Sequence, residues 1–228
     1  MYFDQYYVIL VLPTILLSAV AQILVKSTFS KYSKQACKKG LNGATAAQLL
    51  LRANNITNVR IEPVAGQLTD HYSPTEHVLR LSEPVYAKNS IAAVGVAAHE
   101  TGHAIQHDVG YSPLWMRSTL VPVAYIGSQF GPILAIAGLF LSFGILIDIG
   151  LILFAASVAF YVITLPVEFN ASHRAIKILR ETGSLDEEEL KGVKKVLTAA
   201  AMTYVASALT AIASFMRLVL ITRNRRDD

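Results

Sequence analysis

The sequence has almost no cysteine and no strong excess of one charge. Its 228 residues include one cysteine, Cys37, and carry a net charge of +4. A single thiol cannot form a disulfide within the chain. It also cannot supply the several thiolates of a cysteine-based structural zinc site. The modest positive charge does not form the concentrated basic patch typical of nucleic-acid-binding proteins, so we expect no nucleic-acid partner.

Charged residues of both signs are scarce, and long apolar stretches take their place. Only 16% of residues are charged and 53% are apolar, whereas a soluble domain carries about 25% charged residues. Three stretches reach roughly the 20 residues that cross a bilayer as a helix: residues 6–25, 119–143 and 144–165. A fourth stretch, 197–221, is long enough but contains Arg217. The sequence predicts a mainly α membrane protein with about four transmembrane helices, so the lipid bilayer is its first partner.

Basic residues predict the orientation of these spans. The first span has no Lys or Arg before it, which favours an uncleaved anchor over a signal peptide although Ala19-Val20-Ala21 resembles a cleavage site. Sixteen of the twenty basic residues fall in 26–118 and 166–196. The positive-inside rule places these two segments in the cytoplasm. The predicted organisation is an anchor at 1–25, a domain at 26–118, a transmembrane hairpin at 119–165, a helical segment at 166–196, and a final helix with a basic tail at 197–228.

The segment between the first two spans predicts a small α+β domain. Thr45 and Gln48 have the spacing of a capping box before a helix that ends near residues 54–55. Residues 59–62 and 79–82 alternate like strands, and the polar stretch 66–77 between them is typical of a loop. Ser90 is suited to cap a second helix, which Gly110 would end.

This second helix carries the motif His99-Glu100-Thr101-Gly102-His103. Two histidines four residues apart lie on one helix face and can bind one zinc ion. Zinc lowers the pKa of a bound water, and Glu100 is placed to take the proton of that water. The same carboxyl can then protonate a leaving amine. The motif therefore indicates a zinc metallopeptidase.

A catalytic zinc usually has three protein ligands, and the motif supplies two. Gln106 and Val109 stand where a metzincin would have Gly and His, which excludes that class. The third ligand must come from elsewhere, and a carboxylate as in the two-His-one-Glu type is favoured. The candidates are Glu168, Glu181 and the run Glu187-Glu188-Glu189. Glu168 differs from the others because it lies where the third span re-enters the cytoplasm, whereas Glu181 and the run resemble solvated helix faces.

Three longer segments resemble the YugP-type neutral zinc metallopeptidases of bacterial membranes. They are the stretch from LTDHYSPTEH through HETGHAIQH, the stretch YSPLWMRSTLVPVAYIGSQ, and LPVEFNASHRA. The resemblance covers nearly the whole chain and implies His99, His103 and Glu168 as zinc ligands. Family members often carry Asp at the position of Ser73, so the resemblance does not extend a catalytic role to this residue.

Four further residues are candidates for supporting roles. Ser172 lies one helical turn after Glu168 and could hydrogen-bond a ligand histidine. His173 is a candidate donor to the developing oxyanion, or a basic surface residue. His71 and Tyr72 lie in the predicted polar loop, which could line the cleft and place a donor against the transition state.

We therefore expect a multi-pass zinc endopeptidase of the bacterial cell membrane, with a cytoplasmic zincin-like domain of the gluzincin type and a protein or peptide substrate. The alternative is a noncatalytic membrane scaffold with a structural zinc, for which His71, His77 or His173 would close the site as a fourth ligand. The sequence leaves open whether the chain binds a second copy or another membrane protein.

Overall fold

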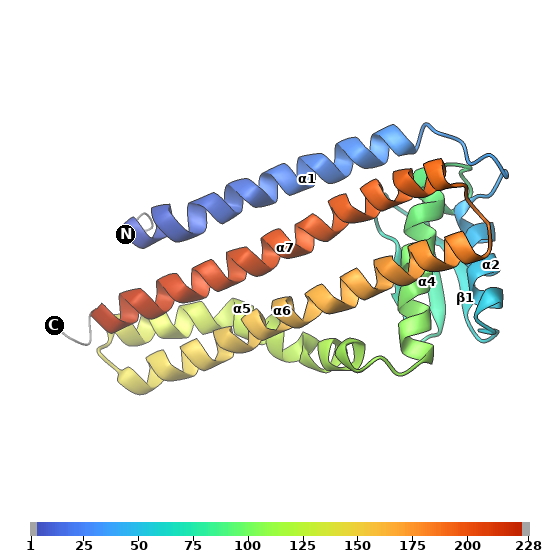
Figure 1. Cartoon of the computed structure of the whole chain (residues 1–228). Coiled ribbons are helices and arrows are strands. Elements are labelled where there is room, and N and C mark those ends of the chain that lie inside the picture. The colour runs from blue at the N-terminus through green and yellow to red at the C-terminus, as the bar shows by residue number, and fades with distance from the viewer. Residues whose placement is uncertain (1–3, 225–228) are drawn as a thin grey trace. The chain divides into compact units, whose positions relative to one another are not determined.

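A computed structural model describes residues 4–224, which are mainly helical and fall into two compact units (Figure 1). The first, here called the helical unit, contains the residues up to Gln22, Pro113–Pro166, and those from Met202 onward. The second, here called the site unit, contains Ile23–Ser112 and Val167–Ala201. All residues of the predicted zinc site belong to the site unit.

Four helical stretches are long and apolar enough to cross a bilayer, in agreement with the predicted number. The first, Tyr7–Tyr32, consists of the π-helical turn η1 (Tyr7–Val11) and α1 (Leu12–Tyr32). The other three are α5 (Ser112–Phe140), α6 (Gly144–Glu181) and α7 (Glu187–Asn224). α6 and α7 extend well beyond the predicted spans 144–165 and 197–221, because polar helical residues continue the apolar ones. α5 begins at Ser112, before the predicted span 119–143, and ends within it at Phe140.

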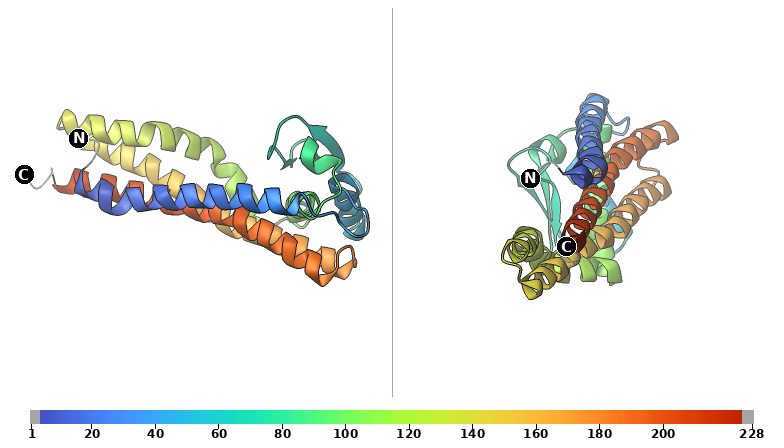
Figure 2. Two further views of the ribbon diagram at one scale, coloured as in Figure 1. Left: turned by 90° about the horizontal axis from the view of Figure 1, so that it is seen from above. Right: turned by 90° about the vertical axis from the view of Figure 1, so that its left-hand side faces the viewer.

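In the helical unit, α5 and the first part of α6 form an antiparallel hairpin (Figures 1 and 2). Glycines let the two backbones approach closely. A Cβ atom added at Gly150 would lie 2.4 Å from the backbone nitrogen of Ala135, and one added at Gly131 would lie 2.9 Å from the carbonyl oxygen of Gly150. Small residues at helix crossings are the usual means of close packing in membranes.

The arginine that interrupts the fourth apolar stretch has an acidic partner in the same unit. Arg217 donates from Nη2 and Nε to Oδ2 of Asp4, at 2.6 and 3.0 Å, and its guanidinium also lies over the ring of Tyr7. A charge in an apolar helix is tolerated when it is paired. This pairing explains how α7 can be a membrane span in spite of Arg217.

The site unit contains a three-stranded sheet, formed by β1 (Arg60–Val64), β2 (His71–Ser73) and β3 (Val78–Ser82) in the order β1-β3-β2. β3 pairs parallel with β1 and antiparallel with β2. The central strand is buried, and its Leu79 and Leu81 pack in one core cluster with alanines of α4 (Ile91–Asp108). The short α3 (Glu83–Tyr86) links the sheet to this helix, and α2 (Gly43–Ala53) packs beside it (Figure 1).

Local signals set both ends of α4. The Ser90 hydroxyl accepts a hydrogen bond from the backbone N–H of Ala93 at 3.2 Å, as expected of an N-cap. Gly110 follows the last turn with a φ of +64°, a conformation that glycine adopts readily. Both predictions for this helix are confirmed.

Two local predictions are wrong. The capping box of α2 is formed by Asn42 and Thr45, since the Asn42 side chain accepts from the Thr45 N–H at 2.8 Å. The Thr45–Gln48 pair does not make it. The predicted loop 66–77 contains the strand β2, because His71–Ser73 pair with β3. That pairing is long-range and leaves little signal in a stretch of three residues.

A close backbone contact joins α4 to the part of α6 that belongs to the site unit. A Cβ atom added at Gly102 would lie 2.5 Å from the carbonyl oxygen of Ala171, closer than any real contact. A residue larger than glycine at position 102 would push these two helices apart.

We expect Gly102→Ala to destabilise the site unit by about 1–3 kcal/mol, because the added methyl meets backbone that cannot rotate away. The measurement is the thermal unfolding midpoint of the detergent-purified protein. Gly95→Ala is the control on the same helix, since a Cβ there lies 3.2 Å from a side-chain methyl of Val193, which can shift. An equal midpoint for the two variants would contradict the proposed helix contact.

Candidate metal centre

The two motif histidines lie one turn apart on α4 and turn their rings toward each other. The ring centroids of His99 and His103 are 4.8 Å apart, with the planes almost perpendicular. This is the geometry that the i, i+4 spacing predicts for two side chains on one helix face. His103 is buried and His99 is partly buried, so only a small part of the pair is open to solvent.

Glu168 on α6 completes a group of three donors. Its Oε2 lies 3.2 Å from Nε2 of His99 and 3.7 Å from Nε2 of His103. The carboxylate is 2% exposed, and one ligand atom from each of the three residues lies within 4.8 Å of the others. The structure therefore brings together the residues that the resemblance implies as ligands.

These distances fit a zinc ion. Ligand atoms at about 2.0–2.2 Å from a tetrahedral zinc are separated from one another by about 3.4 Å. The two distances from Oε2 to the imidazole nitrogens lie on either side of that value. The donor set of two imidazoles and one carboxylate is also one that zinc prefers. The side chains present thus fit the metal that the sequence predicts.

The second ring nitrogen of His103 is held by Gln106. Its Nδ1 lies 3.0 Å from Oε1 of Gln106, whose amide Nε2 donates to Oδ1 of Asn170 at 3.0 Å and to a backbone carbonyl of α6 at 2.8 Å. Because this amide is used as a donor, its oxygen must accept, so Nδ1 of His103 carries the proton. Nε2 is then left with the lone pair that binds a metal.

His99 has a matching partner on α6. Its Nδ1 lies 3.0 Å from Oγ of Ser172, the residue one turn after Glu168. The sequence suggested this contact for Ser172, but the roles of Gln106 and Asn170 were missed. The signal available in the sequence was the position of Gln106 three residues after His103, on the same helix face. The structure shows that Gln106 is also fully buried.

Electrostatics keep Glu168 charged. Burial by itself would raise the pKa of this carboxyl, but the imidazoles of His103 and His99 beside it outweigh this effect and hold the pKa well below the usual range. For His103, burial opposes the charged ring, yet the neighbouring carboxylates of Glu168 and Glu100 raise the pKa. A buried carboxylate that is kept in its charged form beside two imidazoles is suited to a cation.

The pKa of Glu100 shifts in the opposite direction to that of Glu168. Burial raises the pKa of its carboxyl, and the charges of Glu168 and Asp70 add to this effect, although His99 and His103 oppose it. A carboxylate with a raised pKa is a stronger base than a free glutamate. Glu100 does not belong to the three-donor group.

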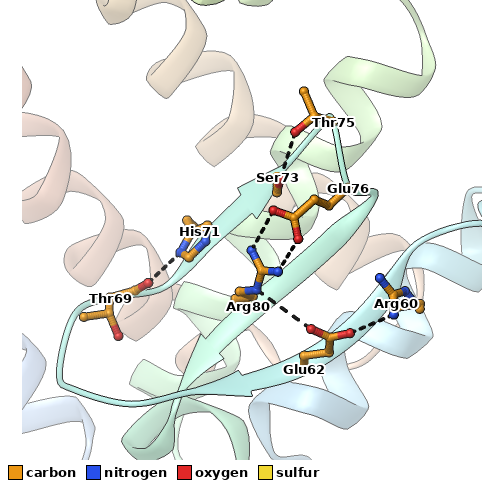
Figure 3. A network of polar contacts seen from close by, with 8 residues as sticks. All are labelled: Arg60, Glu62, Thr69, His71, Ser73, Thr75, Glu76 and Arg80. Carbon is orange, nitrogen blue, oxygen red and sulfur yellow. Dashed lines mark hydrogen bonds and ion pairs between the residues drawn. The ribbon is translucent and has the colours of Figure 1, made fainter.

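His71 does not belong to the three-donor group. It is exposed on β2, opposite Arg80 in the sheet register, and its Nδ1 lies 2.8 Å from the carbonyl oxygen of Thr69. Figure 3 shows it in a polar network in which Arg80 pairs with Glu76 and Glu62. This network lies on the polar face of the sheet, whereas α4 packs with the leucines of β3.

Tyr72 and His173 also lie outside the three-donor group. The side chain of Tyr72 packs against the core, and its hydroxyl forms a hydrogen bond of 2.8 Å with Nδ1 of His107, near the end of α4. Burial raises the pKa of this phenol. His173 is exposed on α6. Neither residue is a member of the donor group.

The other candidates for third ligand serve structural roles. Glu181 pairs with Lys177, and Glu187 pairs with Arg180. Glu189 is buried and accepts hydrogen bonds from the backbone N–H groups of Lys38 and Asp186, at 2.7 and 3.0 Å. The prediction that the whole acidic run faces solvent is therefore wrong for Glu189, which joins the start of α7 to the chain after α1.

Comparison with known proteins agrees with this geometry. Residues 7–223 match the family described as "Putative neutral zinc metallopeptidase". The chain is 47% identical over 222 residues to the "Putative membrane protease YugP" of Bacillus subtilis (strain 168), which covers 97% of this chain and 99% of that protein. No solved structure matches the chain. Since the family match spans nearly the whole sequence, the chain belongs to this family of zinc metallopeptidases.

Proposed function

We propose that this protein is a membrane-embedded zinc endopeptidase with a zincin-like active site of the gluzincin type. The observation that carries the proposal is the buried Glu168 carboxylate, which lies within 3.7 Å of Nε2 of both motif histidines. The catalytic part consists of residues 26–118, with the third ligand from 166–196. The anchor 1–25, the hairpin 119–165 and the final segment 197–228 form the membrane part.

In this proposal His99, His103 and Glu168 hold the zinc ion. When bound, zinc polarises the scissile carbonyl of a protein or peptide substrate and makes a water molecule acidic enough to attack at neutral pH. Ser172 and Gln106 fix the two imidazole rings through their Nδ1 atoms, so that both Nε2 atoms face the carboxylate of Glu168.

Glu100 moves the protons. Its carboxylate accepts a proton from the attacking water, and the resulting carboxylic acid gives that proton to the departing amine. The raised pKa of Glu100 suits both steps, because the group binds the proton more readily than a free glutamate would. The hydrogen bond between the Tyr72 hydroxyl and His107 would have to break before this hydroxyl could reach a substrate carbonyl.

The alternative, a noncatalytic scaffold with structural zinc, requires a closed set of four protein ligands. Within residues 4–224, the donor group contains three. His71 is engaged by Thr69, His77 packs its ring against His107, and His173 is exposed. A three-ligand group leaves one coordination position for water, which favours catalysis.

We expect Glu100→Gln to lower peptide cleavage by roughly a hundredfold to ten-thousandfold, the usual contribution of a general acid–base group, while zinc stays bound. The measurement is hydrolysis of a pool of quenched fluorescent peptides by detergent-purified protein, with zinc determined by mass spectrometry. Glu181→Gln is the matched control, because this glutamate is exposed and its ion pair in the described residues is with Lys177. Cleavage that persists in Glu100→Gln would refute the proton-transfer role, and a zinc-loaded wild type that cleaves nothing would favour the scaffold.

We also propose that the catalytic part faces the cytoplasm of a bacterial cell, because 26–118 and 166–196 contain sixteen of the twenty basic residues. Protease added outside intact cells should leave epitope tags at Lys34 and Lys88 untouched, since both residues are exposed and would be accessible from the correct side. Permeabilised cells provide the control in which both tags are cut. Loss of the tags in intact cells would reverse the assigned orientation.

A further inference from the structure

A groove in the site unit lies between the last turns of α1 and the first turns of α7, remote in sequence from the zinc ligands. Its volume is about 580 Å³. Leu24, Thr28 and Lys31 line it from one face of α1, at the spacing of successive helical turns. The two helices touch beside it, since a Cβ atom added at Gly192 would lie 2.8 Å from the ring of Tyr32.

One end of this groove is strongly basic. Lys191, Lys194 and Lys195 line it from a single face of α7, and Lys31 lies opposite on α1. All four lysines are exposed. Among the ion pairs of residues 4–224, none joins a carboxylate to any of these four side chains.

The nearby acidic residues act mainly on other groups, although the charge of Glu187 also acts on Lys191 and that of exposed Glu188 acts on Lys38. The basic end therefore keeps an excess of positive charge. Glu187 pairs with Arg180, and Asp186 pairs with Lys38. The side chain of Glu189 is buried against backbone N–H groups. Four lysines that line one groove, and that form no ion pair in the part of the chain that the structure describes, attract an anion.

The opposite end of the groove is apolar and continues into the membrane spans. Leu24 is 44% exposed and belongs to the apolar stretch 6–25. Ala199, on the other wall, belongs to the stretch 197–221. The groove therefore lies where the charged residues of both helices give way to apolar ones, which is the level of the lipid headgroups.

We propose that this groove binds one anionic phospholipid, with the phosphate among the four lysines and an acyl chain along Leu24, Thr28 and Ala199. The charge of the groove selects an anionic headgroup over a zwitterionic one. Its apolar end selects a lipid over a soluble anion or an acidic peptide, neither of which would cover exposed leucine. The bound lipid would hold α1 against α7, whose start is joined through Glu189 to the chain after α1.

The test is native mass spectrometry of the detergent-purified protein with phosphatidylglycerol or phosphatidylcholine of the same acyl chains. We expect one phosphatidylglycerol to bind roughly tenfold more tightly than phosphatidylcholine. The triple variant Lys31→Gln/Lys194→Gln/Lys195→Gln should lose most of this preference. Thr198→Trp, at an exposed lining position, should weaken binding of both lipids by filling the groove without changing its charge.

The control is Lys26→Gln/Lys34→Gln/Lys88→Gln, which removes the same charge from exposed lysines that do not line the groove. It should bind phosphatidylglycerol within about twofold of wild type, because long-range attraction alone is screened by salt. An equal loss in the two triple variants would overturn the site, as would equal binding of the two lipids. Displacement of the lipid by inorganic phosphate or by an acidic peptide would also overturn it. Retained zinc in each variant shows that the fold is intact.

Discussion

The contact between Gly102 and the backbone of Ala171 fixes how closely α4 and α6 approach each other in the site unit. Glu168 lies one turn before Ala171, and His99 and His103 lie on either side of Gly102. A helix contact at this point therefore brings one carboxylate between two imidazoles. The glycine inside the histidine motif has a packing reason that is independent of the chemistry of its neighbours.

Hydrogen bonds to the Nδ1 atoms also fix the two imidazole rings. Ser172 and Gln106 each engage one Nδ1 atom, and Gln106 is in turn bound to Asn170, which also accepts from Arg174. A buried carboxylate is costly unless it is paired, and here its partners are the two imidazoles. These three side chains could hold a metal ion. Because apolar residues often replace buried ionic groups without loss of stability, packing alone does not explain this arrangement.

Signals between residues that are close in the sequence made much of α4 and of the candidate metal site predictable. Ser90, Gly110 and the histidine spacing describe α4 almost to its ends, because caps and helix faces depend on near neighbours. The strand at His71–Ser73 and the burial of Glu189 were not predictable, since each depends on a distant partner. The same holds for Gln106, because its side-chain amide donates to Asn170 on the distant helix α6. Glu168 was predicted as the third zinc ligand from its position at the end of a span and from the family resemblance, not from spacing alone.

The most direct measurement is the zinc content of the detergent-purified wild-type protein beside Glu168→Ala, with Glu181→Ala as the control for loss of an exposed glutamate. The three-ligand site predicts about one zinc per wild-type and control chain, and zinc that is lost or strongly weakened in Glu168→Ala, because two imidazoles alone hold zinc poorly. Zinc unchanged in Glu168→Ala would show that another residue is the third ligand. A wild-type protein without zinc would contradict the metal centre itself.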